Sequence, residues 1–234
     1  MITTIFFDLD GTLLPMDQNT FLHAYLGSLA RKMAPYGYEP QTLVESIWKS
    51  TGAMVMNNGT SRNDEIFWQT FSEIHQRDTR VDEPVFEDFY RCEFQNVRNA
   101  CGFNPRAHET IATLKEMGFR LVLATNPLFP AIATHSRTKW SGLQPDNFEH
   151  ITTYENSYHC KPNPDYYREI LDKLNLQASE CLMVGNDVSE DMVAAKVGMH
   201  VFLLTDCLIN KSQEDISQYP HGSFPELLEF IRSL

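Results

Sequence analysis

The chain has 234 residues, of which 42% are hydrophobic and 21% are charged, and its formal net charge at pH 7 is −12. This composition excludes a globally disordered protein, and no apolar run reaches the ~20 residues that a membrane span needs. The negative charge opposes nonspecific binding to nucleic acid or to an anionic membrane surface. We therefore expect a soluble protein with no nucleic-acid partner and no membrane partner.

The five cysteines are odd in number and widely scattered, and they contain no CxxC pair. Such a pattern indicates neither a disulfide framework nor a zinc site, and the first residues lack the features of a signal peptide. A reducing cytoplasm is the expected location. Nothing in the sequence defines an oligomeric state, and a monomer is consistent with it.

The first β-rich run covers residues 2–7 and is followed directly by the segment DLDGT, which contains Asp8 and Asp10. A strand that ends here can turn both carboxylates towards a common site, and Gly11 permits the tight exit. Two neighbouring acids suit magnesium binding or phosphoryl chemistry. The alternative is structural, because Asp-Gly is a frequent turn pair.

The next hundred residues have little parallel-strand character, and this length exceeds what one crossover connection needs. We predict an inserted all-helical domain at residues 15–104, with the remaining core formed by residues 1–14 and 105–234. Ser61 is the expected N-cap of the third helix, and the aromatic residues Phe67, Trp68 and Phe71 are expected to pack against neighbouring helices. Helices are predicted at 18–33, 40–56, 62–76 and 83–96.

Further β-rich runs alternate with helix-like sequence in the second half of the chain. Alternation of this kind predicts an α/β fold with a Rossmann-like parallel sheet and helices on both faces. The polar residues that follow the strands should then meet at the carboxyl edge, where open α/β sheets bind ligands. The runs lie at 119–124, 150–153, 181–184 and 200–204.

Two of these segments suit phosphate binding. Thr125 and Asn126 close the strand at 119–124, so that a hydroxyl and a backbone N–H reach the edge that carries Asp8. Lys161 precedes a Pro-Asn-Pro segment. Asn163 can act as the N-cap of a helix that begins at Pro164, and Lys161 would then lie beside the start of that helix.

The strand at 181–184 is followed by an acidic segment, GNDVSED, that contains Asp187 and Asp191. These carboxylates could complete an oxygen-rich magnesium site, because magnesium prefers oxygen ligands. The alternative is an acid-rich helix N-terminus with Ser189 as its cap. Both interpretations can hold together.

These four segments, in this order and at strand ends, resemble the four motifs of the haloacid dehalogenase-like superfamily of phosphohydrolases. The resemblance runs from Asp8 to Asp191, and the helical insert is similar to the cap found between motifs one and two in one branch of that superfamily. The fourth motif differs in having Asn186 before Asp187.

The resemblance implies that Asp8 is the nucleophile, which forms an aspartyl-phosphate, and that Asp10 acts first as general acid and then as general base. Thr125 and Lys161 would bind the transferring phosphoryl group, and these four residues are the expected catalytic set. The implied phosphate-binding residues are Asp8, Leu9, Asp10, Thr125, Asn126 and Lys161.

The resemblance also implies Mg²⁺ as the cofactor, held by Asp8, the backbone carbonyl of Asp10 and Asp187. Asp191 would act one shell further out or would orient Lys161. The expected function is a magnesium-dependent phosphatase acting on a small phosphorylated metabolite. Two alternatives stay open: a phosphomutase of the same superfamily, and a catalytically silent protein that binds a phosphate ligand.

Substrate identity is not encoded in a recognisable motif. By the same resemblance, the loop at 57–59 and the residues just after Thr12 are candidate specificity elements. Arg62, Arg77 and Arg91 are candidates for binding a second anion, although each can equally be a helix-surface charge.

Overall fold

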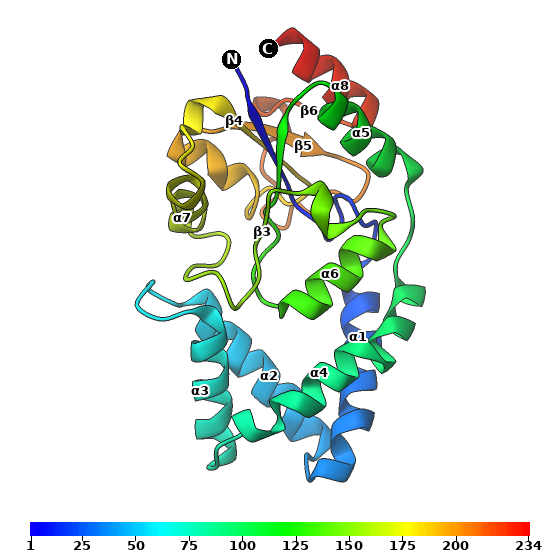
Figure 1. Cartoon of the computed structure of the whole chain (residues 1–234), viewed down its shortest axis with the longest axis vertical. Coiled ribbons are helices and arrows are strands. Elements are labelled where there is room, and N and C mark those ends of the chain that lie inside the picture. The colour runs from blue at the N-terminus through cyan, green and yellow to red at the C-terminus, as the bar shows by residue number, and fades with distance from the viewer.

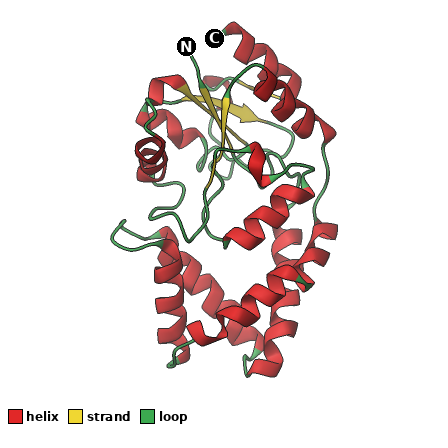
Figure 2. Ribbon diagram, in the orientation of Figure 1, coloured by secondary structure: helices red, strands yellow, loops and turns green.

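The computed structural model describes all 234 residues. Its centre is a six-stranded, all-parallel sheet in the order β3-β2-β1-β4-β5-β6, with helices on both sides (Figures 1 and 2). The predicted α/β fold is confirmed, and each of the five predicted strands is present. The strands are β1 Thr4–Phe7, β2 Arg120–Leu123, β3 His150–Ile151, β4 Cys181–Gly185, β5 His200–Leu204 and β6 His221–Gly222.

Side chains alternate between the two faces of the sheet and so feed two separate hydrophobic clusters. On one face, Ile5 and Phe7 pack with the helices α5 (Pro105–Glu116), α6 (Ala131–Trp140) and α8 (Phe224–Ser233). On the other face, Phe6 packs with α7 (Pro164–Leu174) and with a 3₁₀ helix at Met192–Val197. Full burial of a phenylalanine contributes about 1.5–3 kcal/mol, so both faces hold β1 in the centre of the sheet.

The chain from residue 18 to residue 100 is mostly helical and lies away from the sheet, in the lower half of Figure 1. The helix predicted at 83–96 ends at Arg91, and a 3₁₀ helix, Glu93–Ala100, continues the chain. Ser61 does not cap the third helix, because that helix begins at Asn63 and Arg62 takes the N-cap position. The four α-helices are α1 Gln18–Met33, α2 Pro40–Val55, α3 Asn63–His75 and α4 Glu83–Arg91.

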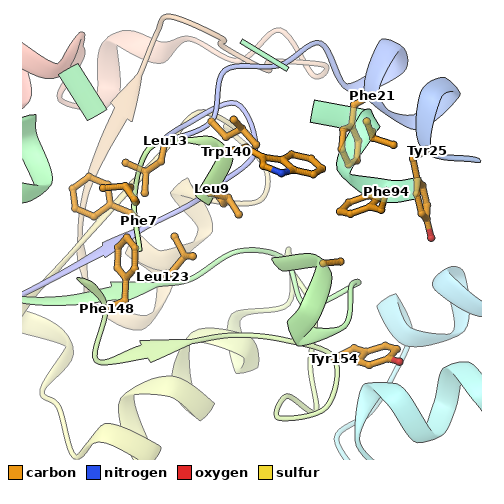
Figure 3. Packing of buried hydrophobic residues seen from close by; sticks show 14 of the residues in the cluster. Phe7, Leu9, Leu13, Phe21, Tyr25, Phe94, Leu123, Trp140, Phe148 and Tyr154 are labelled. Carbon is orange, nitrogen blue, oxygen red and sulfur yellow. The ribbon is translucent and has the colours of Figure 1, made fainter. Parts of the chain in front are cut away.

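The aromatic residues of α3 pack among the helices as expected. The Phe71 ring stacks on the Phe67 ring at a centroid distance of 5.5 Å, and Trp68 meets Phe86 of α4 edge to face at 5.3 Å. Figure 3 shows a second group, in which Phe21 and Tyr25 of α1 lie beside Phe94. These side chains join the helical segment to the same hydrophobic cluster that covers the sheet.

The two stretches of chain that connect the helical segment to the sheet region lie side by side. The Gly102 N–H donates to the Pro15 carbonyl at 2.7 Å, and Met16 and Cys101 form an isolated β-bridge. The start of α3 also contacts a loop of the sheet region, since the Asn63 and Asp64 N–H groups donate to the carbonyls of Ser157 and Tyr154 at 2.9 and 3.0 Å. None of the helices combines the length and the apolar character needed to cross a bilayer.

Candidate active site

Asp8 lies at the carboxyl end of the central strand β1. Its N–H donates to the Val184 carbonyl of β4 at 2.9 Å, which continues the sheet pairing by one residue. Its carboxylate accepts a hydrogen bond from Lys161 Nζ at 2.9 Å and one from the Thr12 hydroxyl at 3.2 Å. Two groups therefore orient one carboxylate, and the residue is only 8% exposed.

Gly11 makes the turn that brings Thr12 back to Asp8. Its φ is +88°, and an added Cβ would lie 2.4 Å from Asn186 Nδ2. The single proton of the Thr12 hydroxyl is shared between Asp8 and Asn186 Oδ1, which lies 2.9 Å away, so the two strand ends of β1 and β4 are joined at this turn. Glycine is required here both by the backbone conformation and by the close approach of Asn186.

Lys161 is buried between two carboxylates. Its Nζ donates to Asp191 Oδ1 at 2.6 Å as well as to Asp8. Burial by itself lowers the pKa of Lys161, but the carboxylates of Asp191 and Asp8 outweigh it, and the pKa lies above the usual lysine range. The Asn163 side chain caps α7 by accepting from the Asp165 N–H at 2.9 Å, and this places Lys161 before the helix entrance.

Asp10 points to a different partner. Its Oδ2 accepts a short hydrogen bond from Arg137, a residue of α6 that is wholly buried, whereas its Oδ1 has no hydrogen-bond partner. Burial raises the pKa of Asp10 above its usual range, although Arg137 opposes that shift. Arg137 was not predicted from the sequence as a residue of the site. Its spacing from the buried Ala133 and Thr134 of α6 is helical, and that is the signal that marks an arginine facing the interior.

The edge of the sheet also offers hydrogen-bond donors that no protein group uses. The backbone N–H groups of Leu9, Asp10 and Asn126 donate no hydrogen bond within the protein, and the Thr125 hydroxyl, at the cavity described below, has no partner either. The Leu9 side chain lies in the hydrophobic core, so this residue can contribute only its backbone. Donors grouped in this way suit the oxygen atoms of an anion.

The segment after β4 is held by its own carboxylates. Asp187 Oδ1 accepts from the N–H groups of Ser189 and Glu190 at 2.8 and 3.0 Å, and Asp191 Oδ2 accepts from the Asp187 N–H at 2.9 Å. Asp187, rather than Ser189, thus binds the N–H groups of the turn at 188–191. This turn leads into the 3₁₀ helix instead of an α-helix, and the N-cap residue of that helix, Asp191, makes no side-chain capping hydrogen bond. Gly185 is required because an added Cβ would lie 2.1 Å from Asp191 Oδ2.

Glu190 is, after Arg137, the second residue of the site that was not predicted from the sequence. Its Oε2 accepts a hydrogen bond from Asn126 Nδ2 at 3.0 Å, and it lines the same cavity as the aspartates. Burial raises the pKa of Glu190 to about 7, against the opposing effect of Lys161. The Asn126 side chain thus links the second and fourth segments, while its Oδ1 is buried and has no partner.

The oxygen atoms at this site are of the kind that bind a magnesium ion. Asp8 and Asp187 supply carboxylate oxygens at the cavity, and the Asp10 carbonyl accepts no hydrogen bond from the protein. No group of three His, Cys, Asp or Glu side chains is placed to hold a metal through side chains alone. Two carboxylates, one carbonyl and several waters are a set that Mg²⁺ accepts, because it retains water ligands.

A cavity of about 450 Å³ lies over this edge, between the sheet and the helical segment. Its wall includes Tyr25, Trp68 and Tyr90 from the helices and Phe129 from the sheet region. Phe67 and Trp68 therefore have a second role beyond packing, since both line the cavity.

The candidate specificity elements of the helical segment lie elsewhere. The loop at 57–59 is not part of the cavity wall and instead meets the His159 ring. The three candidate arginines are paired with carboxylates outside the cavity: Arg62 with Asp64, Arg77 with Asp82 and Arg91 with Glu87. The expectation that these residues face the substrate is not supported by their positions.

Comparison with known proteins agrees with this architecture. The pyrophosphatase PpaX of Halalkalibacterium halodurans is 25% identical over 98% of this chain and 97% of its own length. A phosphoglycolate phosphatase of Aliivibrio fischeri is 28% identical over 87% of this chain and 84% of its own. A crystal structure of a phosphatase from Thermococcus onnurineus shares the fold, with a TM-score of 0.59 and 19% identity over 98% of both chains.

The sequence profile of the haloacid dehalogenase-like hydrolases matches residues 2–198, which include all four segments at the strand ends. The match thus covers strands β1 to β4, the helical segment and every polar residue that surrounds Asp8. The chain belongs to the haloacid dehalogenase-like hydrolase family.

Proposed function

We propose that this protein is a phosphatase that hydrolyses phosphate monoesters through an aspartyl-phosphate on Asp8. The observation that supports this most is the position of the Asp8 carboxylate, which Lys161 and Thr12 orient at 2.9 and 3.2 Å beside several unused N–H donors. A fixed carboxylate surrounded by donors can attack phosphorus while the donors hold the phosphoryl oxygens. The names of the similar proteins, a pyrophosphatase and a phosphoglycolate phosphatase, agree with phosphorylated substrates.

In the first step, Asp8 attacks phosphorus and the ester bond to the leaving oxygen breaks. Lys161, the Thr125 hydroxyl and the free N–H of Asn126 bind the phosphoryl oxygens, and Lys161 also reduces repulsion between Asp8 and the incoming anion. Asp10 donates its proton to the leaving oxygen. Its raised pKa favours the protonated form that this step needs.

In the second step, Asp10 is ionised and accepts a proton from a water molecule that attacks the aspartyl-phosphate. Asp8 is regenerated and inorganic phosphate leaves. Arg137 would keep Oδ2 of Asp10 fixed through both steps, while Oδ1 is buried and makes no hydrogen bond within the protein.

Asp8, the Asp10 carbonyl and Asp187 would hold a Mg²⁺ ion, and Asp191 would orient Lys161. When bound, the metal supplies positive charge that offsets the charge of the phosphate. Residues 15–104 would serve as a cap that excludes bulk water from the site, and residues 1–14 and 105–234 as the catalytic core.

The experiment is phosphate release with magnesium present, from a panel of phosphate monoesters, by the wild type and Asp8→Asn. The amide keeps the side chain's shape and removes the attacking charge, so release should fall by several orders of magnitude, at about 1.4 kcal/mol per tenfold. Asp172→Asn, an exposed aspartate of α7, is the matched control. Isomerised sugar phosphate without phosphate release would indicate a phosphomutase, and full activity of Asp8→Asn would overturn the mechanism.

A further inference from the structure

We propose that the substrate is the phosphate ester of a neutral, largely apolar alcohol that carries a ring or a branched hydrocarbon, rather than a small substrate with a second carboxylate or phosphate. This inference rests on the proposed function and concerns the part of the substrate beyond the phosphoryl group. It is carried by the wall of the cavity and by the position of the charges around it.

The cavity wall opposite Asp8 is apolar. Leu22 and Leu26 of α1, Ile47 of α2 and Trp68 of α3 line it, together with Phe86 and Phe129. A volume of about 450 Å³ lies in the range of pockets that enclose a ring-bearing ligand. A two-carbon substrate would leave most of this apolar surface in contact with water, whereas a hydrocarbon group would cover it.

The two buried cations near the cavity are already committed, and the one unpaired cation, Lys211, lies outside the helices that form the apolar wall. Lys161 lies between Asp8 and Asp191, and Arg137 is paired with Asp10, so both cations serve the phosphoryl end. The only cationic side chain in the cavity wall is Lys211, an exposed residue that follows β5. A second anionic group placed among the helices would therefore lose its hydration without gaining a charged partner.

The polar groups on the helical side are neutral. The amides of Gln18 and Asn19 line the cavity without a hydrogen-bond partner in the protein, and Trp68 Nε1 is also unpartnered. The hydroxyls of Tyr25 and Tyr90 share a hydrogen bond at 2.9 Å, and both rings line the cavity. Burial raises the pKa of Tyr25 to about 12, so this hydroxyl stays uncharged. Thr51 of α2 adds one more hydroxyl. These groups can accommodate a hydroxyl or carbonyl of a substrate but cannot neutralise a carboxylate.

A set of three synthetic esters separates charge from apolar contact. Benzyl phosphate and 4-carboxybenzyl phosphate share a benzylic leaving oxygen and a ring and differ in a remote carboxylate, and ethyl phosphate lacks the ring. With magnesium present, kcat/KM for benzyl phosphate should exceed the value for each of the other two by at least about tenfold. It should also exceed the values for phosphoglycolate and pyrophosphate.

Leu22→Arg tests the same inference by adding a cation to the cavity wall. Leu22 is only partly buried, which leaves room for the longer side chain. The ratio of kcat/KM for 4-carboxybenzyl phosphate over benzyl phosphate should rise by about tenfold or more. Met56→Arg, at a residue that is 82% exposed and outside the cavity, is the matched control and should leave the ratio unchanged.

The outcomes distinguish the two proposals. Equal or better turnover of ethyl phosphate, 4-carboxybenzyl phosphate, phosphoglycolate or pyrophosphate would overturn the substrate class and leave the phosphatase proposal intact. An unchanged ratio in folded Leu22→Arg would also overturn the substrate class, and if that variant does not fold, the wild-type ratios decide. No phosphate release from any of these esters by the folded, magnesium-supplied wild type would overturn the proposed function itself.

Discussion

Arg137 of α6 is wholly buried and directs its guanidinium at Asp10, which follows β1 by three residues. The guanidinium also lies 4.2 Å from the centroid of the Phe129 ring, and its Nη2 donates to the Thr134 hydroxyl at 3.3 Å. Three contacts thus fix an arginine whose one carboxylate partner is the proposed acid and base. We expect Arg137 to be a positioning residue for Asp10.

Arg137→Met should lower kcat by at least about tenfold with a smaller change in KM, because Asp10 loses the contact that fixes its direction. Since Arg137 lowers the pKa of Asp10, its removal should move the alkaline limb of the pH–rate profile to higher pH. The pH dependence of kcat checks this. The control is Arg168→Met, at an exposed arginine of α7, and an unmoved profile with wild-type kcat in Arg137→Met would contradict the assignment.

Asp187 and Asp191 should respond differently to magnesium. Asp187→Ala is expected to raise the magnesium concentration needed for half-maximal activity, because it removes a proposed ligand. Asp191→Ala should affect the metal less but should lower stability, by an amount of the order of 3 kcal/mol, because Lys161 loses one of its two buried partners. Magnesium titration and urea unfolding of both variants test the ranking. A greater magnesium requirement in Asp191→Ala would reverse the ligand assignment.

Glu190 should make the protein less stable as the pH rises. Its pKa is raised from 4.5 to about 7, so between these values the folded state binds more protons than the unfolded state, and the free energy of unfolding falls with increasing pH. Glu190→Gln removes this dependence. Near pH 4.5 the free energy of unfolding of the variant should equal that of the wild type. Above pH 7 it should be larger by up to about 3 kcal/mol, and solvent screening of the Glu190 charge reduces this difference.

Urea unfolding at a series of pH values, with a chelator present, measures this difference. Glu109→Gln, at an exposed residue of α5, is the matched control. If the difference between Glu190→Gln and the wild type does not grow with pH, the buried Glu190 carboxyl is not the cause.

Replacing either of two glycines with alanine should change the stability of the protein, but in opposite directions. Gly11→Ala places a Cβ on a backbone with a φ of +88° and brings it against Asn186. This variant should lose about 1–2 kcal/mol of stability. Its activity should also fall, because the turn at Gly11 positions Thr12 beside Asp8. Gly52→Ala lies in α2 with no atom within 4 Å of the added Cβ, and should stabilise the protein by about 0.5–1 kcal/mol. Thermal unfolding of both variants measures the two signs, and a stabilised Gly11→Ala would refute the proposed requirement for glycine.

The position of the site was predictable from the sequence because a parallel sheet has a fixed geometry. Alternating strands and helices bring the carboxyl ends of β1, β2 and β4 to one edge, so residues that follow those strands meet there. Asp8, Thr125 and Asp187 could be grouped on this ground alone. The strand β6 escaped prediction because its two residues, His221 and Gly222, follow Pro220 and have no run of β-branched or aromatic residues around them.

Tertiary structure alone decided the partners within the site and the wall of the cavity. A helical pattern identifies Arg137 or Trp68 as facing inward, but the same pattern describes a residue that packs against protein and one that faces a cavity. Arg137 meets Asp10 only because α6 packs beside the end of β1, across more than a hundred residues of chain. The sequence by itself determined which groups reach the edge of the sheet, since local patterns mark where each strand ends and parallel strands bring their carboxyl ends to one edge. Which cations are left for a substrate depends on contacts between distant segments, and only folding the chain settles those.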